Sequence, residues 1–371
     1  MSQAKDIIDY LSLARERGAS DVHLCVGAPP AARVDGVLQP LDDYDLEPDD
    51  TKELILSALT ETQRAKLEEE LQLDFALKID NIGRFRGNAH YARGNIELAL
   101  RYVPSEIPTL RDLGHGSAVE KLCNTRSGLI LVTGVTGSGK STTLASMVKT
   151  IAAQRSVVIV TIEDPIEFEF EHSFGMIKQR QIGTDAIDFP SALRAAMRQD
   201  PDVIVVSEMR DLETIQTAIT AAETGHLVIA TLHTIDAPGS IDRMIDAFPA
   251  NQQSGIASQV ANCLTATISQ RLIPRCDAAG RVMASEILLV NHAVRNCILE
   301  RKLEQVVGLI QIGSHEGMHT IDDSVAHLFN NGHISYDDAI FNSRDPDHVN
   351  EQYAIAQRAA ALAAEAEAKK K

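Results

Sequence analysis

The sequence has no apolar run near the roughly 18 residues that a membrane-spanning helix requires. Its first residues are polar and include an acidic residue, so they lack the basic start and apolar core of a secretion signal. The five cysteines stand singly, and no C-x-x-C pair of the kind that builds zinc or redox sites is present. We therefore expect a soluble, cytoplasmic protein with reduced thiols.

Basic residues are also comparatively few. Thirty-five Lys and Arg against 52 Asp and Glu give a formal net charge of -17, which repels phosphodiester backbones unless a local basic stripe compensates. We expect no nucleic-acid partner, and a DNA-translocating motor is a disfavoured alternative. The length of 371 residues and the 44% hydrophobic content are those of a globular chain with about two or three domains.

Residues 1–103 have the pattern of a mixed α and β domain. Apolar spacing predicts helices at Ile7–Ala14 and Glu53–Leu71. Strand patterns occur at Val22–Val26, Arg33–Leu38, Leu73–Ile79, Arg84–Tyr91 and Leu98–Val103. Prolines and glycines across residues 104–116 then predict a linker, with a plausible hinge.

From Gly128 the pattern changes to apolar strands that alternate with helices, which is typical of a parallel sheet covered on both faces. The predicted strands are Leu129–Thr133, Val157–Ile162, Val203–Val206 and Leu227–Leu232. After Gln252 the pattern is mostly helical. We expect an α/β domain over residues 117–350 and an Ala, Glu and Lys-rich tail, residues 351–371, that forms a fraying helix.

One segment predicts chemistry directly, because it fits G-x-x-x-x-G-K-[ST] between a strand and a helix. Its glycines let backbone N–H groups surround a β-phosphate, Lys140 supplies charge to the β and γ oxygens, and Ser141 can ligate Mg²⁺. The predicted ATP-binding residues are Gly134, Thr136, Gly137, Ser138, Gly139, Lys140, Ser141 and Thr142.

Two predicted strands end in carboxylates. One delivers Glu163 and Asp164, and the other delivers Glu208. Carboxyl ends of parallel strands lie at the edge of the sheet where the phosphate loop also lies. We expect these acids to position the attacking water or to help Ser141 hold the metal, with Glu208 as the second ligand. Helix capping or simple solvation is the alternative for each of them.

Histidines and arginines provide further candidates. His226 and His233 flank the fourth strand, so one of them could contact the γ-phosphate, although an isolated strand-end histidine is as often only a satisfied polar residue. Arg84, Arg86 and Arg101 lie on predicted strands of the first domain, and one could offset transition-state charge at a neighbouring site. A solvated strand face is the alternative for the arginines.

With these motifs the sequence resembles the PilT-like type IV pilus retraction ATPases of the secretion ATPase superfamily. The resemblance runs from end to end. The similar segments are Ala19–Leu24, the phosphate loop, Thr161–Glu167 (an Asp box), Asp200–Asp211 (a Walker B region), Thr224–Thr234 (a His box), Asn291–Glu300 and Gly313–Ile321.

The resemblance implies a PAS-like N-terminal domain, a RecA-like domain and a homo-hexamer that binds ATP and Mg²⁺ at its junctions. It implies that Glu163 and Glu208 are catalytic acids, that His226 and His233 belong to the His box, and that N-terminal arginines act on nucleotide. It also implies a peripheral place at the inner membrane, on a pilus platform protein reached through Asn291–Glu300, and a role in twitching motility.

Two positions depart from the family pattern. Val135 stands where proline is common, and Ser207 stands where glycine is usual. We expect nucleotide binding to survive with Val135, whereas Ser207 adds a side chain beside Glu208 that could alter the rate of hydrolysis. The rivals are an accessory retraction ATPase working beside a related one, an assembly or secretion ATPase, and a nucleotide-binding scaffold without turnover. The second rival usually carries a longer N-terminal region and a four-cysteine zinc site.

Overall fold

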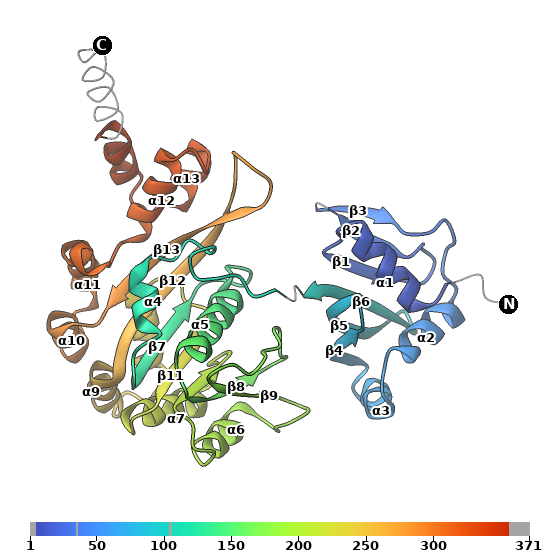
Figure 1. The fold of residues 1–371 in the computed structure, drawn as a ribbon, viewed down its shortest axis with the longest axis horizontal. Helices are drawn as coiled ribbons and strands as arrows, with labels where there is room; N and C mark the ends of the chain where they lie inside the picture. Colours follow the sequence, from blue (N-terminus) through green and yellow to red (C-terminus); the bar gives the residue numbers. More distant parts are fainter. Residues whose placement is uncertain (1–4, 35, 104–105, 356–371) are drawn as a thin grey trace, which may run out of the picture. The chain divides into compact units, whose positions relative to one another are not determined.

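The computed structural model describes residues 5–34, 36–103 and 106–355, and it divides into two compact units. The first comprises Met1–Glu106 with Pro165–Glu169, and the second comprises Ile107–Asp164 with Phe170–Lys371. Figure 1 shows the elements of each unit. The segment expected as a linker is therefore divided, since residues 107–116 belong to the second unit, where Leu110 and His115 are buried.

The N-terminal unit is built on one antiparallel sheet in the order β3-β2-β1-β6-β5-β4. Its strands are β1 (Asp21–Leu24), β2 (Ala31–Val34), β3 (Val37–Pro40), β4 (Gln72–Ile79), β5 (Gly83–Ala92) and β6 (Asn95–Val103). Its helices are α1 (Ile7–Glu16), α2 (Pro48–Ser57) and α3 (Glu61–Glu70). Tyr10 and Leu11 of α1 share one core with Leu98 and Leu100 of β6.

The single helix expected at Glu53–Leu71 is two helices. Thr60 begins α3 with a capping box, in which its hydroxyl accepts from Gln63 N and the Gln63 side chain accepts from Thr60 N. This reciprocal bonding satisfies backbone donors that a continuous helix would have used, so the chain turns there.

The C-terminal unit has a seven-stranded sheet in the order β13-β12-β7-β11-β10-β8-β9, parallel except for β13. The strands are β7 (Gly128–Thr133), β8 (Val158–Glu163), β9 (Met176–Gln181), β10 (Val203–Val206), β11 (Leu227–Leu232), β12 (Leu264–Pro274) and β13 (Arg281–Leu289). The helices are α4 (Ser117–Leu122), α5 (Lys140–Gln154), α6 (Phe189–Ala196), α7 (Leu212–Glu223), α8 (Ala237–Asp246), α9 (Gln253–Cys263), α10 (His292–Leu299), α11 (Val306–Ile312), α12 (Ile321–Asn330) and α13 (Tyr336–Asn342), with 3-10 turns at Leu303–Gln305 and Gly313–Glu316.

Side chains of the central strands alternate between two cores, one on each face of this sheet. In β7, Leu129 and Leu131 join a core that includes α7, α8 and α9, whereas Ile130 and Val132 join one that includes α4 and α5. Continuous apolar runs are expected for parallel strands buried on both faces. The predicted fold class is confirmed: an N-terminal PAS-like α+β domain precedes a RecA-like P-loop domain with a helical C-terminal region.

All four predicted strands of this sheet are present, as β7, β8, β10 and β11. The expectation of a mostly helical chain directly after Gln252 was wrong for β12 and β13. Strand β12 carries the buried polar side chains Thr267, Ser269 and Gln270, which interrupt the apolar run that marks a buried strand. The helical region begins at α10, and residues 356–371 of the expected tail lie outside the described residues.

Candidate active site

The phosphate loop lies between β7 and α5, where the sequence places it. Gly134, Gly137 and Gly139 all have positive φ, and the value at Gly134 is 144°. A Cβ atom on Gly134 would lie 2.4 Å from Gln270 O and 2.5 Å from Ser138 Oγ, so no larger residue fits there. The backbone of the loop therefore requires glycine for both conformation and space.

Lys140 folds back over its own loop. Its Nζ donates to Gly134 O at 2.8 Å and to Val135 O at 3.1 Å. These carbonyls hold the ammonium group at the mouth of the loop, where it can be transferred to phosphate oxygens. Ser141 is exposed at the first turn of α5, and the side chain of Val135 is 52% exposed, so neither closes the loop.

The carboxyl ends of the central strands meet at the same edge of the sheet as the loop. Gly134 N bonds to Leu232 O, the last residue of β11, and Ser207 N bonds to Ile162 O of β8. Ser207 O in turn accepts from the hydroxyl of Thr231. These bonds fix the ends of β7, β11, β10 and β8 against one another, so that Glu208 and the loop share one edge.

Glu208 is the acid of this edge that contacts both an arginine and a histidine. Arg210 donates from Nε to Oε1 and from Nη2 to Oε2, both at 2.7 Å, and His233 Nε2 lies 2.8 Å from Oε1. Burial alone would raise the pKa of Glu208, but the hydrogen bond from Arg210 and the charges of His233 and Arg210 outweigh it and hold that pKa below its ordinary value. Glu208 is therefore an ionised carboxylate at neutral pH.

Glu163 ends β8 and is 8% exposed. Its Oε1 accepts from Thr161 Oγ1 at 2.6 Å and from Gln179 Nε2 at 3.0 Å. The neighbouring Asp164 is exposed. These two hydrogen bonds orient the carboxylate of Glu163 at the end of β8.

The two histidines lie at opposite ends of β11. His233 contacts Glu208, at the edge that carries the phosphate loop. His226 precedes the strand, and its Nδ1 lies 2.9 Å from Ala221 O and 3.3 Å from Thr224 Oγ1. The geometry brings His233, and not His226, into the group of residues around Glu208.

The three candidate arginines belong to the N-terminal unit, and each has an acidic partner in that unit. Arg84 Nη1 lies 3.0 Å from Glu169, Arg86 lies 3.7 Å from Glu167, and Arg101 Nε donates to Asp21 at 2.8 Å. These acidic partners compete with a nucleotide for each arginine.

Two residues that the sequence analysis did not single out contribute to the site. Arg210 follows Glu208 by two residues and binds its carboxylate. The sequence signal that could have identified Arg210 is a basic residue close to a strand-end acid, in the segment Glu208-Met209-Arg210. Gln270 of β12 is buried, and its Nε2 donates to Ser138 O of the phosphate loop at 2.8 Å. Gln270 could not be found from the sequence because its strand was not predicted.

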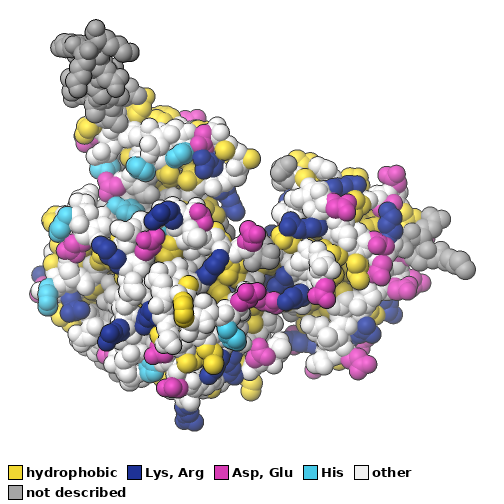
Figure 2. Space-filling view, in the orientation of Figure 1, with side chains coloured by type: hydrophobic (Ala, Val, Ile, Leu, Met, Phe, Trp, Pro, Cys, Tyr) yellow, Lys and Arg dark blue, Asp and Glu magenta, His cyan; other side chains and the backbone are white. Residues whose placement is uncertain are grey.

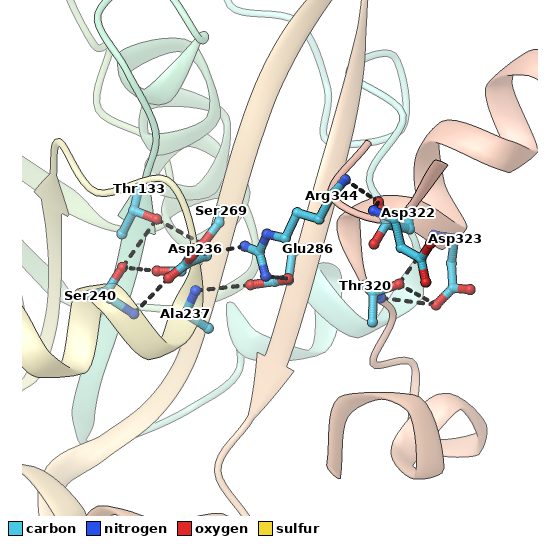
Figure 3. A network of polar contacts seen from close by, with 12 residues as sticks. Thr133, Asp236, Ala237, Ser240, Ser269, Glu286, Thr320, Asp322, Asp323 and Arg344 are labelled. Carbon is cyan, nitrogen blue, oxygen red and sulfur yellow. Dashed lines mark hydrogen bonds and ion pairs between the residues drawn. The ribbon is translucent and has the colours of Figure 1, made fainter. Parts of the chain in front are cut away.

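A buried polar network lies behind the loop (Figure 3). Thr133, the last residue of β7, donates its hydroxyl to Ser269 at 2.8 Å, and Ser240 of α8 donates to Thr133 at 3.4 Å. These hydroxyls join the strand that enters the loop to β12 and to the first turns of α8.

The same figure shows an ion-pair cluster beside these hydroxyls. Arg344 lies 3.1 Å from Asp236 and 3.3 Å from Glu286, whose side chain is fully buried, and Ala237 N donates to the other oxygen of Glu286 at 2.9 Å. Burial raises the pKa of Glu286, although Arg344 opposes it. The cluster ties β13 and the start of α8 to the segment after α13.

The metal-binding capacity of this edge follows from its donors. The described residues contain no group of three or more His, Cys, Asp or Glu side chains able to hold a metal ion. The exposed hydroxyl of Ser141 fits one ligand position of a Mg²⁺ that takes most of its oxygens from phosphates and water. Both oxygens of Glu208 accept from Arg210, so Arg210 competes with a metal ion for this carboxylate.

A RecA-like sheet with a glycine-rich phosphate loop and acids at the same edge defines a P-loop nucleotide-binding protein. Comparisons with known proteins specify the family. The model of the family described as "Type II/IV secretion system protein" matches residues 4–316. The chain belongs to this family, and within it to the PilT-like secretion ATPases.

Individual relatives support this family assignment. The type IV pilus retractation ATPase PilT of Pseudomonas aeruginosa is 42% identical over 92% of this chain and 99% of its own length. The type IV pilus ATPase PilU of the same organism is 36% identical over 89% of this chain and 86% of its own. A crystal structure of the pilus retraction motor PilT with bound ADP matches with a TM-score of 0.88 and 47% identity, covering 94% of this chain and all of that one.

Within residues 5–34, 36–103 and 106–355, no helix is long and apolar enough to cross a membrane.

Proposed function

We propose that this chain hydrolyses ATP at the subunit junctions of a homo-hexamer and thereby drives type IV pilus retraction and twitching motility. The observation that carries the proposal is Glu208, ionised and oriented by Arg210 and His233 at the edge that holds the phosphate loop. Similarity to a retraction ATPase over 92% of the chain supports the biological role.

The residues of the loop bind and orient the nucleotide. The backbone N–H groups of residues 134–142 surround the β-phosphate, and the N-terminus of α5 adds its dipole. Lys140 exchanges the carbonyls of Gly134 and Val135 for the β and γ oxygens. Ser141 would hold a Mg²⁺ ion, which would neutralise phosphate charge.

The acids and histidines act on the attacking water. Glu208 accepts its proton, and Glu163, fixed by Thr161 and Gln179, orients it from the neighbouring strand. His233 contacts Glu208 and so links the state of the γ-phosphate to the end of β11. For His226, the position at the other edge of the sheet supports a role in the strand rather than at the phosphate.

The hexamer completes the site. Arg84, Arg86 or Arg101 supplies positive charge to the nucleotide of a neighbouring subunit after its ion pair opens. The ring works in the cytoplasm, peripherally on the inner membrane, and engages a pilus platform protein through Asn291–Glu300. In that segment His292, Asn296 and Glu300 are exposed. On the face shown in Figure 2 basic and acidic side chains are interspersed, which favours a protein partner over nucleic acid.

The test begins with turnover. Lys140→Ala is expected to abolish steady-state ATP hydrolysis, because no other described residue of the loop supplies a cation to the phosphates. Retained hydrolysis in a folded Lys140→Ala hexamer would sink the mechanism. A wild-type rate of phosphate release equal to the blank would instead favour a non-catalytic scaffold.

The direction of work is tested in cells. Deletion of the gene is expected to give hyperpiliated cells that do not twitch, whereas bare cells would indicate an assembly or secretion ATPase. The greater identity to PilT than to PilU, 42% against 36%, favours a principal motor over an accessory one. An accessory role would be indicated by twitching that survives the deletion while a related ATPase is present.

A further inference from the structure

A polar cleft lies at the opposite edge of the C-terminal sheet from the phosphate loop. Its volume is about 420 Å³, and it opens where β7 and β12 begin and where α7 and α9 end. Ser127, Glu223, Asn262, Thr265 and Arg295 are among the residues that line it. None of these residues belongs to the nucleotide site.

Arg295 is the exceptional residue of this cleft. It lies on α10, where it is half-buried, and its Nε is buried without a hydrogen-bond partner. Among the residues that the structure describes, its guanidinium group makes neither a hydrogen bond nor an ion pair. By contrast, Arg301 nearby in the sequence pairs with both Asp242 and Asp246.

Exposed arginines such as Arg126 are also unpaired among the described residues, but Arg295 differs from them because it is half-buried and its Nε is shielded from water. Acidic residues outnumber basic ones by 52 to 35, so carboxylate partners are abundant. A buried donor without a partner destabilises the fold, because it loses its hydrogen bonds to water, and the loss is greater when the group is charged. Such a cost is readily offset when the donor is kept for a ligand, because a guanidinium fork binds a carboxylate or phosphate through two parallel hydrogen bonds.

The other lining groups narrow the chemistry of that ligand. The side chains of Ser127, Asn262 and Thr265 are donors that make no hydrogen bond within the described parts of the chain. Glu223 is the only acid among the cleft's lining residues, and it already accepts from Gln259 Nε2 at 2.8 Å. The cleft therefore offers one guanidinium, three neutral donors and one nearby acid. Glu223 and the net charge of -17 repel added negative charge, so the cleft suits a singly charged anion better than a phosphate dianion.

The backbone keeps this cleft open. Gly128, at the start of β7, has a φ of 117°, and a Cβ atom there would lie 2.3 Å from Thr265 Oγ1 and 2.9 Å from Cys263 O. Any larger residue at this position would push into the side chain of Thr265, one of the donors that line the cleft.

We propose that this cleft is a carboxylate-binding site in which Arg295 receives the carboxylate and Ser127, Asn262 and Thr265 bond to the group that bears it. The carboxylate belongs either to an acidic side chain of a protein partner or to a free small acid. Both sources share the chemistry that Arg295 recognises. The site lies apart from the nucleotide edge, so its occupancy and ATP hydrolysis can be measured separately.

The experiment measures how fast phenylglyoxal modifies Arg295 in the purified full-length protein, by peptide mass spectrometry. Arg126 is an internal control, because it is exposed and adjacent to Ser127 but does not line the cleft. The probes are L-glutamate, the blocked peptide acetyl-Gly-Glu-Gly-amide and its Gln counterpart. A site with a dissociation constant of about 1 mM would slow the modification of Arg295 about tenfold at about 10 mM probe.

Protection of Arg295 by the Glu peptide, with Arg126 unaffected, supports the site and assigns it to a protein side chain. Protection by L-glutamate alone supports it and assigns it to a free acid. Equal protection by the Gln peptide, or no protection by either carboxylate, would overturn the proposal. As a second measurement, Arg295→Gln is expected to abolish calorimetric binding of the protecting probe while Arg126→Gln retains it; the opposite result also rejects the site.

Discussion

Gln270 offers the sharpest test of how the fold positions the nucleotide. It belongs to β12, and its Nε2 donates a hydrogen bond to Ser138 O of the phosphate loop at 2.8 Å. Its Oε1 is buried and has no hydrogen-bond partner within the described residues. The informative change is Gln270→Met, because methionine has a similar length and shape without the amide.

The two consequences of this change separate stability from binding. Gln270→Met removes an unsatisfied buried acceptor but leaves Ser138 O without its donor, and each such group costs about 1–3 kcal/mol. These terms offset one another, so the free energy of unfolding should change by less than about 1 kcal/mol. The phosphate loop loses a bond that fixes its conformation, and a loss of about 1.4 kcal/mol in binding corresponds to a tenfold weaker affinity.

The assay is steady-state ATP hydrolysis together with urea unfolding of the same preparations. We expect KM for ATP to rise about tenfold and kcat to change less than about twofold, the pattern of an interaction lost equally from the bound substrate and the transition state. The matched control is Thr267→Val on the same strand, which removes a buried hydroxyl that makes no hydrogen bond to the loop. An unchanged KM in a stable Gln270→Met protein, or an equal rise in the control, would refute the reasoning.

Three further outcomes follow from the same geometry. Gly134→Ala should lose ATP binding, measured by fluorescent-nucleotide titration, because its Cβ would lie 2.4 Å from Gln270 O; binding at the wild-type affinity would contradict this. Arg344→Met should destabilise the fold by about 3–5 kcal/mol in urea unfolding, since it leaves Glu286 buried without its cation, and Arg344→Met with Glu286→Gln should recover part of that loss. Burial raises the pKa of Glu286 above its ordinary value of 4.5. Between pH 4.5 and the raised pKa, the folded chain therefore binds more protons than the unfolded chain. The contribution of Glu286 to stability is full below pH 4.5 and falls as the pH rises towards and through the raised pKa. Glu286→Gln should flatten this slope, and an unchanged slope would exclude Glu286 as its source.

Predictions from the sequence succeeded where short-range pattern and chemistry coincide. The glycines and lysine of the phosphate loop have a spacing that only a strand, a tight turn and a helix can accommodate. The apolar runs of β7, β8, β10 and β11 are continuous because both faces of each strand are buried. The position of Glu208 at the carboxyl end of a parallel strand predicts that it lies at the same edge as the loop.

Other features were beyond local pattern. Strands β12 and β13 were not predicted, because polar side chains such as Ser269 and Gln270 find their partners in segments more than 100 residues away. Arg84 and Arg86 pair with Glu169 and Glu167, which lie in the segment Pro165–Glu169. This segment belongs to the N-terminal unit although it lies far along the sequence from the rest of that unit. No window of sequence can show such a pairing.

The sequence by itself predicted a nucleotide-binding phosphate loop, because the residues around Lys140 are contiguous and their geometry is set by backbone conformation. The tertiary structure alone decided which residues support that loop and which stay unpaired. Gln270 touches Ser138, Arg210 holds Glu208, and Arg295 has no partner among the described residues. The physical reason is that burial and pairing depend on packing between distant segments, whereas the conformation of a glycine-rich loop depends on its own residues.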